Sequence, residues 1–110
     1  MRSGSRRWRV AREVLFSPEA SQDLIELYEY VSENAGPARA LAYVERIEAY
    51  CGGFATLPER GTRRDDLRPG LRTVGFERRI TIAFHISDAT VTIDRILYGG
   101  RDLGGVFPDG

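Results

Sequence analysis

The stretch "RITIAFHISDATVTIDRILY" (79–98) is typical of two β-strands joined by a tight turn. Side chains of the first strand alternate, with one face made of Ile80, Ile82, Phe84 and Ile86 and the other of Thr81, Ala83 and His85. The second strand alternates as far as Asp94, after which Arg95 stands where an apolar residue is due and Ile96 where a polar one is due. This slip predicts a β-bulge at residues 94–96, or a strand buried partly on both faces.

Two amphipathic helices are predicted upstream of these strands. The segment "REVLFS" (12–17) indicates a short strand, and "SPEA" (17–20) supplies an N-cap at Ser17 and a proline at the first helical position. The short break "ENAGPAR" (33–39) predicts an antiparallel helical hairpin. The acidic side chains of the first helix, Asp23 among them, are expected to be solvated. The stripes predicted to face the core are Ala20, Leu24, Leu27, Tyr28 and Val31 in the first helix and Leu41, Val44, Ile47, Cys51 and Phe54 in the second.

A further strand at "LRTVGF" (71–76) completes the predicted order of strand, helix, helix and three strands. The predicted class is therefore α+β (β-α-α-β-β-β), with the helical hairpin packed on one face of a small, mostly antiparallel sheet. The opposite face is expected to be partly open to a ligand or partner. The length fits a single domain at 12–103, between a basic, flexible N-terminal arm at 1–11 and a C-terminal tail at 104–110.

The composition excludes several classes of function. The single cysteine, Cys51, cannot form an intrachain disulfide, which favours a core position in a cytoplasmic protein. One cysteine and one histidine are too few for an ordinary zinc site, and the sequence has no phosphate-binding glycine motif. No metal and no cofactor are therefore expected. No apolar run approaches the roughly 18 residues that a membrane span needs.

Charge is balanced overall but unevenly distributed. The chain holds 16 basic and 16 acidic residues, and every basic residue is an arginine. A net charge of zero argues against a general nucleic-acid-binding protein. Residues 13–59 hold nine acids and two arginines, a balance of −7, whereas residues 1–12 hold five arginines and no acid. Ion pairs are expected within "RRDD" (63–66), and between Arg95 and either Asp94 or Asp102.

The last predicted strand runs into "YGGRDL" (98–103). The two glycines can adopt positive φ, so the chain can turn sharply there and carry Arg101 toward the open face or the rim of the sheet. Tyrosine and arginine are enriched at binding hot spots, which favours target contact by Tyr98 and Arg101. The alternative is a C-terminal clasp, in which Tyr98 packs as a lid and Arg101 pairs with Asp102 or Asp94.

Taken in order, these segments resemble the ParE/RelE superfamily of toxins from bacterial type II toxin–antitoxin modules, on the ParE-like side (plasmid stabilisation proteins). The resemblance covers roughly residues 12–103 and is carried by "VLFSPEASQDLIELYEYV" (14–31), "LPERG" (57–61), "GLRTVGFERRITIAFHI" (70–86) and "VTIDRILYGGRDL" (91–103). It implies a toxin neutralised by a cognate, ParD-like antitoxin encoded in an adjacent gene. The antitoxin is expected to fold on binding, extend a sheet edge and fill an apolar groove along the helices. Which residues it contacts is left open.

The superfamily has two activities, and the chemistry of the residues present is used to decide between them. ParE-like members inhibit DNA gyrase, whereas RelE-like members are ribosome-dependent mRNA endonucleases. Such cleavage needs a base, cations for the phosphate and an acid. Without lysine, the base would have to be His85. We therefore expect a non-enzymatic, gyrase-directed toxin with no catalytic residue, no membrane partner and no sequence-specific nucleic-acid binding. The alternative is an endonuclease that uses His85. The candidate target contacts are Arg72, Arg95, Tyr98 and Arg101.

Overall fold

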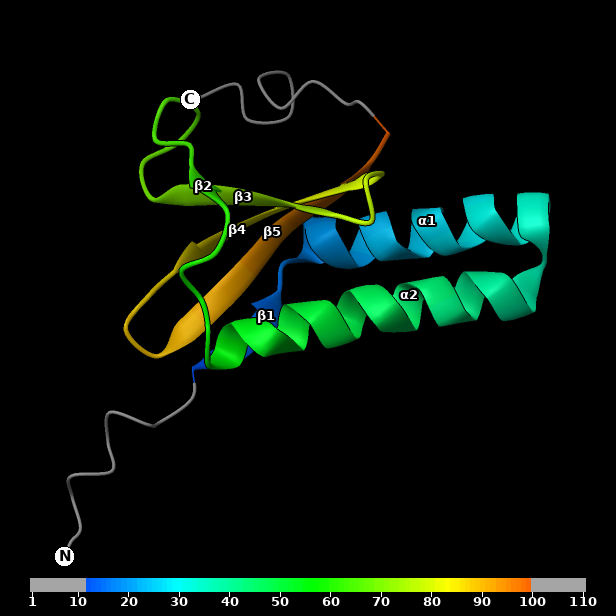
Figure 1. Cartoon of the computed structure of the whole chain (residues 1–110), viewed down its shortest axis with the longest axis horizontal. Helices are drawn as coiled ribbons and strands as arrows, with labels where there is room; N and C mark the ends of the chain where they lie inside the picture. Colours follow the sequence, from blue (N-terminus) through cyan, green and yellow to red (C-terminus); the bar gives the residue numbers. More distant parts are fainter. Residues whose placement is uncertain (1–11, 100–110) are drawn as a thin grey trace, which may run out of the picture.

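A computed structural model describes residues 12–99 and shows two antiparallel helices lying along one face of a five-stranded sheet (Figure 1). The helices are α1 (Pro18–Ala35) and α2 (Pro37–Gly52), and α2 runs into a short 3-10 helix, η2 (Gly53–Ala55). The strands are β1 (Glu13–Phe16), β2 (Thr62–Arg63), β3 (Leu71–Phe76), β4 (Ile80–Ile86) and β5 (Thr90–Tyr98). The predicted α+β class and element order are confirmed; the short η2 and the two-residue β2 were not predicted.

The sheet has the strand order β1-β5-β4-β3-β2. Strands β2, β3, β4 and β5 pair in succession as antiparallel neighbours. Strand β1 pairs with the other edge of β5 in parallel. A parallel pair needs a crossover connection, and the helical hairpin supplies part of it. The mostly antiparallel sheet expected from the sequence is therefore confirmed.

Local sequence signals set the ends of both helices. The Ser17 side chain accepts a hydrogen bond from the Ala20 amide at 3.0 Å, and Pro18 occupies the first turn of α1. Gly36, with φ of 94°, ends α1 and donates its amide hydrogen to the Ser32 carbonyl. Pro37 then begins α2. The tight connection holds the helices antiparallel, as predicted.

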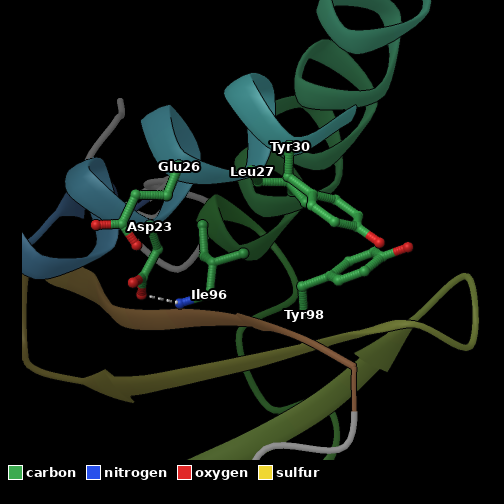
Figure 2. A pocket seen from close by; sticks show the side chains of 6 residues that line it. All are labelled: Asp23, Glu26, Leu27, Tyr30, Ile96 and Tyr98. Atoms are coloured by element: carbon green, nitrogen blue, oxygen red, sulfur yellow. Dashed lines mark hydrogen bonds between the residues drawn. The ribbon is translucent and has the colours of Figure 1, made fainter. Parts of the chain in front are cut away.

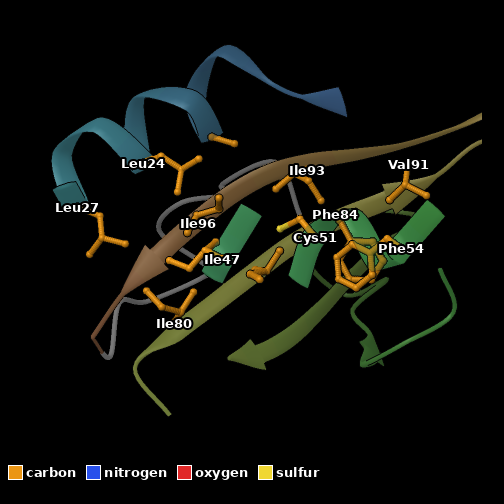
Figure 3. Packing of buried hydrophobic residues seen from close by; sticks show 12 residues of the cluster. Leu24, Leu27, Ile47, Cys51, Phe54, Ile80, Phe84, Val91, Ile93 and Ile96 are labelled. Carbon is orange, nitrogen blue, oxygen red and sulfur yellow. The ribbon is translucent and has the colours of Figure 1, made fainter. Parts of the chain in front are cut away.

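The main core lies between the hairpin and the helix-facing side of the sheet (Figure 3). Phe54 and Phe84 stack there with ring centroids 4.4 Å apart. Cys51 is fully buried, as predicted, and this burial raises the pKa of its thiol to about 12. The cluster also contains Leu24, Leu27, Ile47, Ile80, Ile82, Val91, Ile93 and Ile96.

Two predictions about the burial of apolar residues are wrong. Leu41 is 52% exposed, and Ala40 is the buried residue at that point of α2. Adjacent residues of a helix point about 100° apart, so a displacement of one position exchanges core for solvent. On the opposite face of the sheet, Ala83 is fully buried rather than open. It packs with Leu67 and Leu71, because the loop between β2 and β3 folds over that face.

The predicted β-bulge is confirmed at Asp94. In the β4–β5 register, Phe84 pairs with Ile93 but Ala83 pairs with Arg95, so Asp94 is the extra residue of β5. One inserted residue reverses the facing of all that follow. Ile96 therefore returns to the helix-facing side, where it joins the main core.

We expect Ile82→Ala to lower the free energy of unfolding by about 2–5 kcal/mol, because it opens a cavity in the packed core. Ile82 is fully buried in the main core cluster. Urea denaturation of the purified chain measures the loss. Leu41→Ala is the control, and its half-exposed site should give a change below about 1 kcal/mol. A loss below about 1 kcal/mol at Ile82 would contradict this description of the core.

Candidate functional site at the free end of β5

Strand β5 extends beyond β1, which leaves one of its edges without a neighbouring strand. β1 pairs with β5 only as far as Ile93. Past that point the N-cap residue of α1, Ser17, supplies hydrogen-bond donors to the edge of β5. The Ser17 amide donates to the Ile93 carbonyl and the Ser17 hydroxyl donates to the Asp94 carbonyl, both at 2.9 Å. The Asp23 carboxylate then accepts the Ile96 amide hydrogen at 2.8 Å. The beginning of α1 thus takes the place of a strand along the edge.

Asp23 also binds the Arg95 guanidinium through two hydrogen bonds, of 2.8 and 2.9 Å. The Asp23 carboxylate is buried, so the prediction that it is solvated is wrong. Its hydrogen bonds raise the pKa of Arg95 against the opposing effect of burial. The prediction of Asp94 as the partner is wrong, and Asp102 lies outside the described residues. The spacing of Ala20, Asp23, Leu24 and Leu27 places Asp23 on the buried stripe, which is the signal that the sequence analysis missed.

Tyr98, at the end of β5, lies on the helix-facing side of the sheet. Its ring packs against Tyr30 of α1, with centroids 5.3 Å apart and ring planes at 52° (Figure 2). The two rings close one end of a cavity of about 200 Å³. Figure 2 shows the Asp23 and Glu26 side chains at its other end. Tyr98 therefore lies against α1, and Arg101 is outside the described residues, so the choice between target contact and clasp stays open.

A larger pocket of about 540 Å³, which we call the arginine–tyrosine pocket, includes Tyr98 in its wall. Arg46 of α2 binds Glu77 of the β3–β4 turn through two hydrogen bonds, of 2.9 and 3.0 Å. This pairing lowers the pKa of Glu77 and raises that of Arg46. Burial, then repulsion from Tyr98 and Glu77, raises the pKa of Tyr43. The lining residues are Val31, Ala35, Arg39, Ala42, Tyr43, Arg46, Glu77, Arg79 and Tyr98.

A separate groove of about 520 Å³, which we call the hairpin groove, lies between α1 and α2 beside the end of β1. Ile25 is 52% exposed there, and Glu29 and Glu48 are the only charged residues among its lining. It shares no lining residue with the arginine–tyrosine pocket. The lining residues are Phe16, Ser21, Leu24, Ile25, Tyr28, Glu29, Val44 and Glu48.

His85 lies on the other face of the sheet, next to the bulge. Its Nδ1 is 2.8 Å from Asp94 Oδ2, and Arg68 Nη1 is 3.9 Å from Asp94 Oδ1. A histidine oriented by a carboxylate can serve as a proton acceptor through its second ring nitrogen. The 38% exposure of this side chain leaves the pair accessible. Asp94 faces this side because it follows Ile93, which points toward the helices.

The structure does not bring the predicted target contacts together. Arg72 pairs in register with Phe84, whereas Tyr98 pairs with Ile80 at the other end of β4. The Arg72 side chain donates to the Arg60 carbonyl at 3.0 Å, so it holds the loop after η2. Arg95 is engaged by Asp23, as described above.

The remaining expectations concern ion pairs in the segment 63–66, metal-binding groups and membrane-spanning helices. The ion pairs expected in the loop at 63–66 are confirmed, as Arg63–Asp65 and Arg64–Asp66. Within residues 12–99, no group of three or more histidine, cysteine or acidic side chains is placed to hold a metal ion. The same part of the chain has no helix that is long and apolar enough to cross a membrane.

The fold matches that of a solved structure, and the sequence matches a family model and a relative. A solved structure titled "Chromosomal ParDE TA system from P. aeruginosa" superposes with a TM-score of 0.72, at 24% identity, covering 82% of this chain and 98% of that one. The model of the ParE toxin family, described as the toxin of the type II toxin–antitoxin system parDE, matches residues 14–103. Toxin ParE3 of Caulobacter vibrioides is 34% identical over 90 residues, covering 82% of this chain and 89% of the relative. The chain therefore belongs to the ParE family of type II toxins, which confirms the resemblance found in the sequence.

We expect Asp23→Ala to destabilise the fold by about 3 kcal/mol, because it leaves the Arg95 charge and the Ile96 amide without their acceptor. Denaturant unfolding measures the loss, and amide hydrogen exchange should show faster exchange at Ile96. Glu26→Ala is the control: it removes an exposed carboxylate three residues further along α1 and should cost about 0.5 kcal/mol or less. Similar losses in the two variants would show that the buried pair contributes little.

Proposed function

We propose that this ParE-family toxin is held inactive by a ParD-like antitoxin and that its target is DNA gyrase. The observation that carries the antitoxin proposal is the hairpin groove, with its apolar wall, half-exposed Ile25 and acidic pair Glu29 and Glu48. Support comes from family membership and from the solved ParDE structure, whose title describes a toxin–antitoxin system.

The chemistry of the hairpin groove specifies the kind of segment that fits it. Apolar side chains along two neighbouring helices suit the apolar face of an amphipathic segment. The acidic pair, together with the balance of −7 over residues 13–59, favours basic residues on the segment's flanks. An antitoxin tail that is disordered alone would fold as it enters the groove.

The gyrase proposal depends on family membership and on the limits of the alternative chemistry. His85 and Asp94 provide one proton acceptor, but a nuclease also needs an acid and free cations around the phosphate. Arg95 and Arg72 are engaged by Asp23 and the Arg60 carbonyl. Parallel assays of the purified protein on gyrase supercoiling and on ribosome-bound mRNA test the two targets. Cleavage of mRNA with supercoiling unaffected would reject gyrase.

We expect Ile25→Asp to weaken antitoxin binding by about tenfold or more while the toxin still arrests growth, because the change places a charge in the apolar groove. Calorimetry with the purified antitoxin measures affinity, and induced expression measures growth arrest. Leu57→Asp is the matched control, since Leu57 is 61% exposed and lies outside the groove. Equal affinities for the two variants would remove the hairpin groove from the antitoxin interface.

We expect His85→Ala to leave toxicity unchanged, because the proposed action on gyrase needs no proton acceptor at this site. Growth arrest on induced expression and cleavage of ribosome-bound mRNA are the two measurements. Thr92→Ala, at the residue paired in register with His85 on β5, controls for general disturbance of this face. Metal-independent mRNA cleavage that disappears in His85→Ala would establish the nuclease instead.

A further inference from the structure

We propose that the arginine–tyrosine pocket binds an acidic peptide segment of the toxin's target. This inference rests on the proposed function, because it assumes that the chain acts by contacting a protein. It assigns target contact to Arg39, Arg79, Tyr43 and Tyr98, which come from α2, the β3–β4 turn and the end of β5. Of these four, only Tyr98 was a candidate from the sequence.

The wall of the pocket is held in place by the β3–β4 turn. Glu77 and Arg78 have φ of 50° and 69°, in the left-handed region that residues other than glycine rarely adopt. The Arg46–Glu77 pair ties this turn to α2, and the Gly99 amide ties it to β5 by donating to the Arg79 carbonyl at 2.8 Å. Strained backbone of this kind persists where surrounding contacts impose it, and it clusters at functional sites.

The charges lining the pocket favour an anionic ligand. Arg46 is neutralised by Glu77, whereas Arg39 and Arg79 make no side-chain hydrogen bond or ion pair with any residue of 12–99. The pocket therefore keeps two positive charges that the described side chains do not compensate. Each guanidinium presents a fork of donors that matches a carboxylate.

The remaining lining favours a peptide over a nucleic acid. Val31, Ala35 and Ala42 give the pocket apolar surface, and the Tyr43 and Tyr98 rings add aromatic surface with hydroxyl groups. Tyrosine and arginine together are typical of binding hot spots between proteins. Nucleic-acid binding usually draws on many cations along a phosphate backbone, and the whole chain has zero net charge.

The pocket is chemically opposite to the hairpin groove. Arginines dominate the charged lining of the pocket, whereas glutamates are the charged residues of the groove. A basic antitoxin tail suits the groove and is disfavoured in the pocket, and the reverse holds for an acidic target segment. The toxin can thus distinguish its two partners by charge.

The test uses the full chain with Arg39→Ala and Arg79→Ala together. The control, Arg63→Ala with Arg64→Ala, removes the same charge from the end of β2 and the residue that follows it. Growth arrest, antitoxin affinity and thermal melting are measured for both variants. We expect the pocket variant to lose growth arrest while its antitoxin affinity stays within about threefold and its melting temperature stays close to wild type. The control should remain toxic. If the alanine variant unfolds, Arg39→Gln with Arg79→Gln serves in its place.

A direct binding measurement separates peptide from nucleic acid. Fluorescein-labelled hexaglutamate and hexathymidylate are titrated against the purified chain at low salt, with anisotropy as the readout. Hexaglutamate should bind and should weaken by about tenfold in the pocket variant, as expected for lost charge-assisted hydrogen bonds. Hexathymidylate should not respond to the variant. A larger response with hexathymidylate overturns the peptide assignment.

The remaining outcomes separate this inference from the proposed function. A folded pocket variant that still arrests growth overturns the inference and leaves the proposed function intact. A pocket variant that loses antitoxin affinity assigns the pocket to the antitoxin and also overturns it. If the wild-type chain arrests no growth, the proposed function fails, and hexaglutamate binding then supports or rejects the peptide site independently.

Discussion

The buried carboxylate of Asp23 is the interaction on which the arrangement of this molecule depends. It accepts two hydrogen bonds from Arg95 and one from the Ile96 amide, and so joins α1 to the part of β5 that β1 leaves uncovered. A buried amide or guanidinium without an acceptor destabilises a fold by an amount comparable to a lost hydrogen bond or more. One side chain thus satisfies an exposed strand edge and fixes the position of α1 over it.

The bulge at Asp94 decides which side chains of β5 face the helices. Without the extra residue, Ile96 and Tyr98 would point away from the helices, because side chains alternate along a strand. With it, Ile96 packs into the main core and Tyr98 reaches Tyr30 and the arginine–tyrosine pocket. Asp94 itself lies beside His85 on the opposite face.

The sequence predicted those features that depend on neighbouring residues. The cap at Ser17, the proline that begins α2 at Pro37 and the alternation in β4 defined the element order, and the broken alternation of β5 located the bulge. Features that depend on distant segments were missed. The burial of Ala83 requires a loop to fold back over the sheet, and the pairing of Asp23 joins residues 72 positions apart. The candidate pocket could not be predicted either, because its lining comes from both helices, the β3–β4 turn and the end of β5.

The two proposed surfaces are distinct in chemistry but close in space, and this closeness bears on how an antitoxin can silence the toxin. Ile25 of the hairpin groove and Val31 of the arginine–tyrosine pocket both lie on α1, six residues apart, which corresponds to about 9 Å along the helix axis. A helical segment is about 10 Å wide with its side chains, so one bound in the groove projects beyond the surface that a large target must approach. Under the proposed function, such a segment would exclude the target sterically across α1, which Asp23 holds against the sheet, without a conformational change in the toxin.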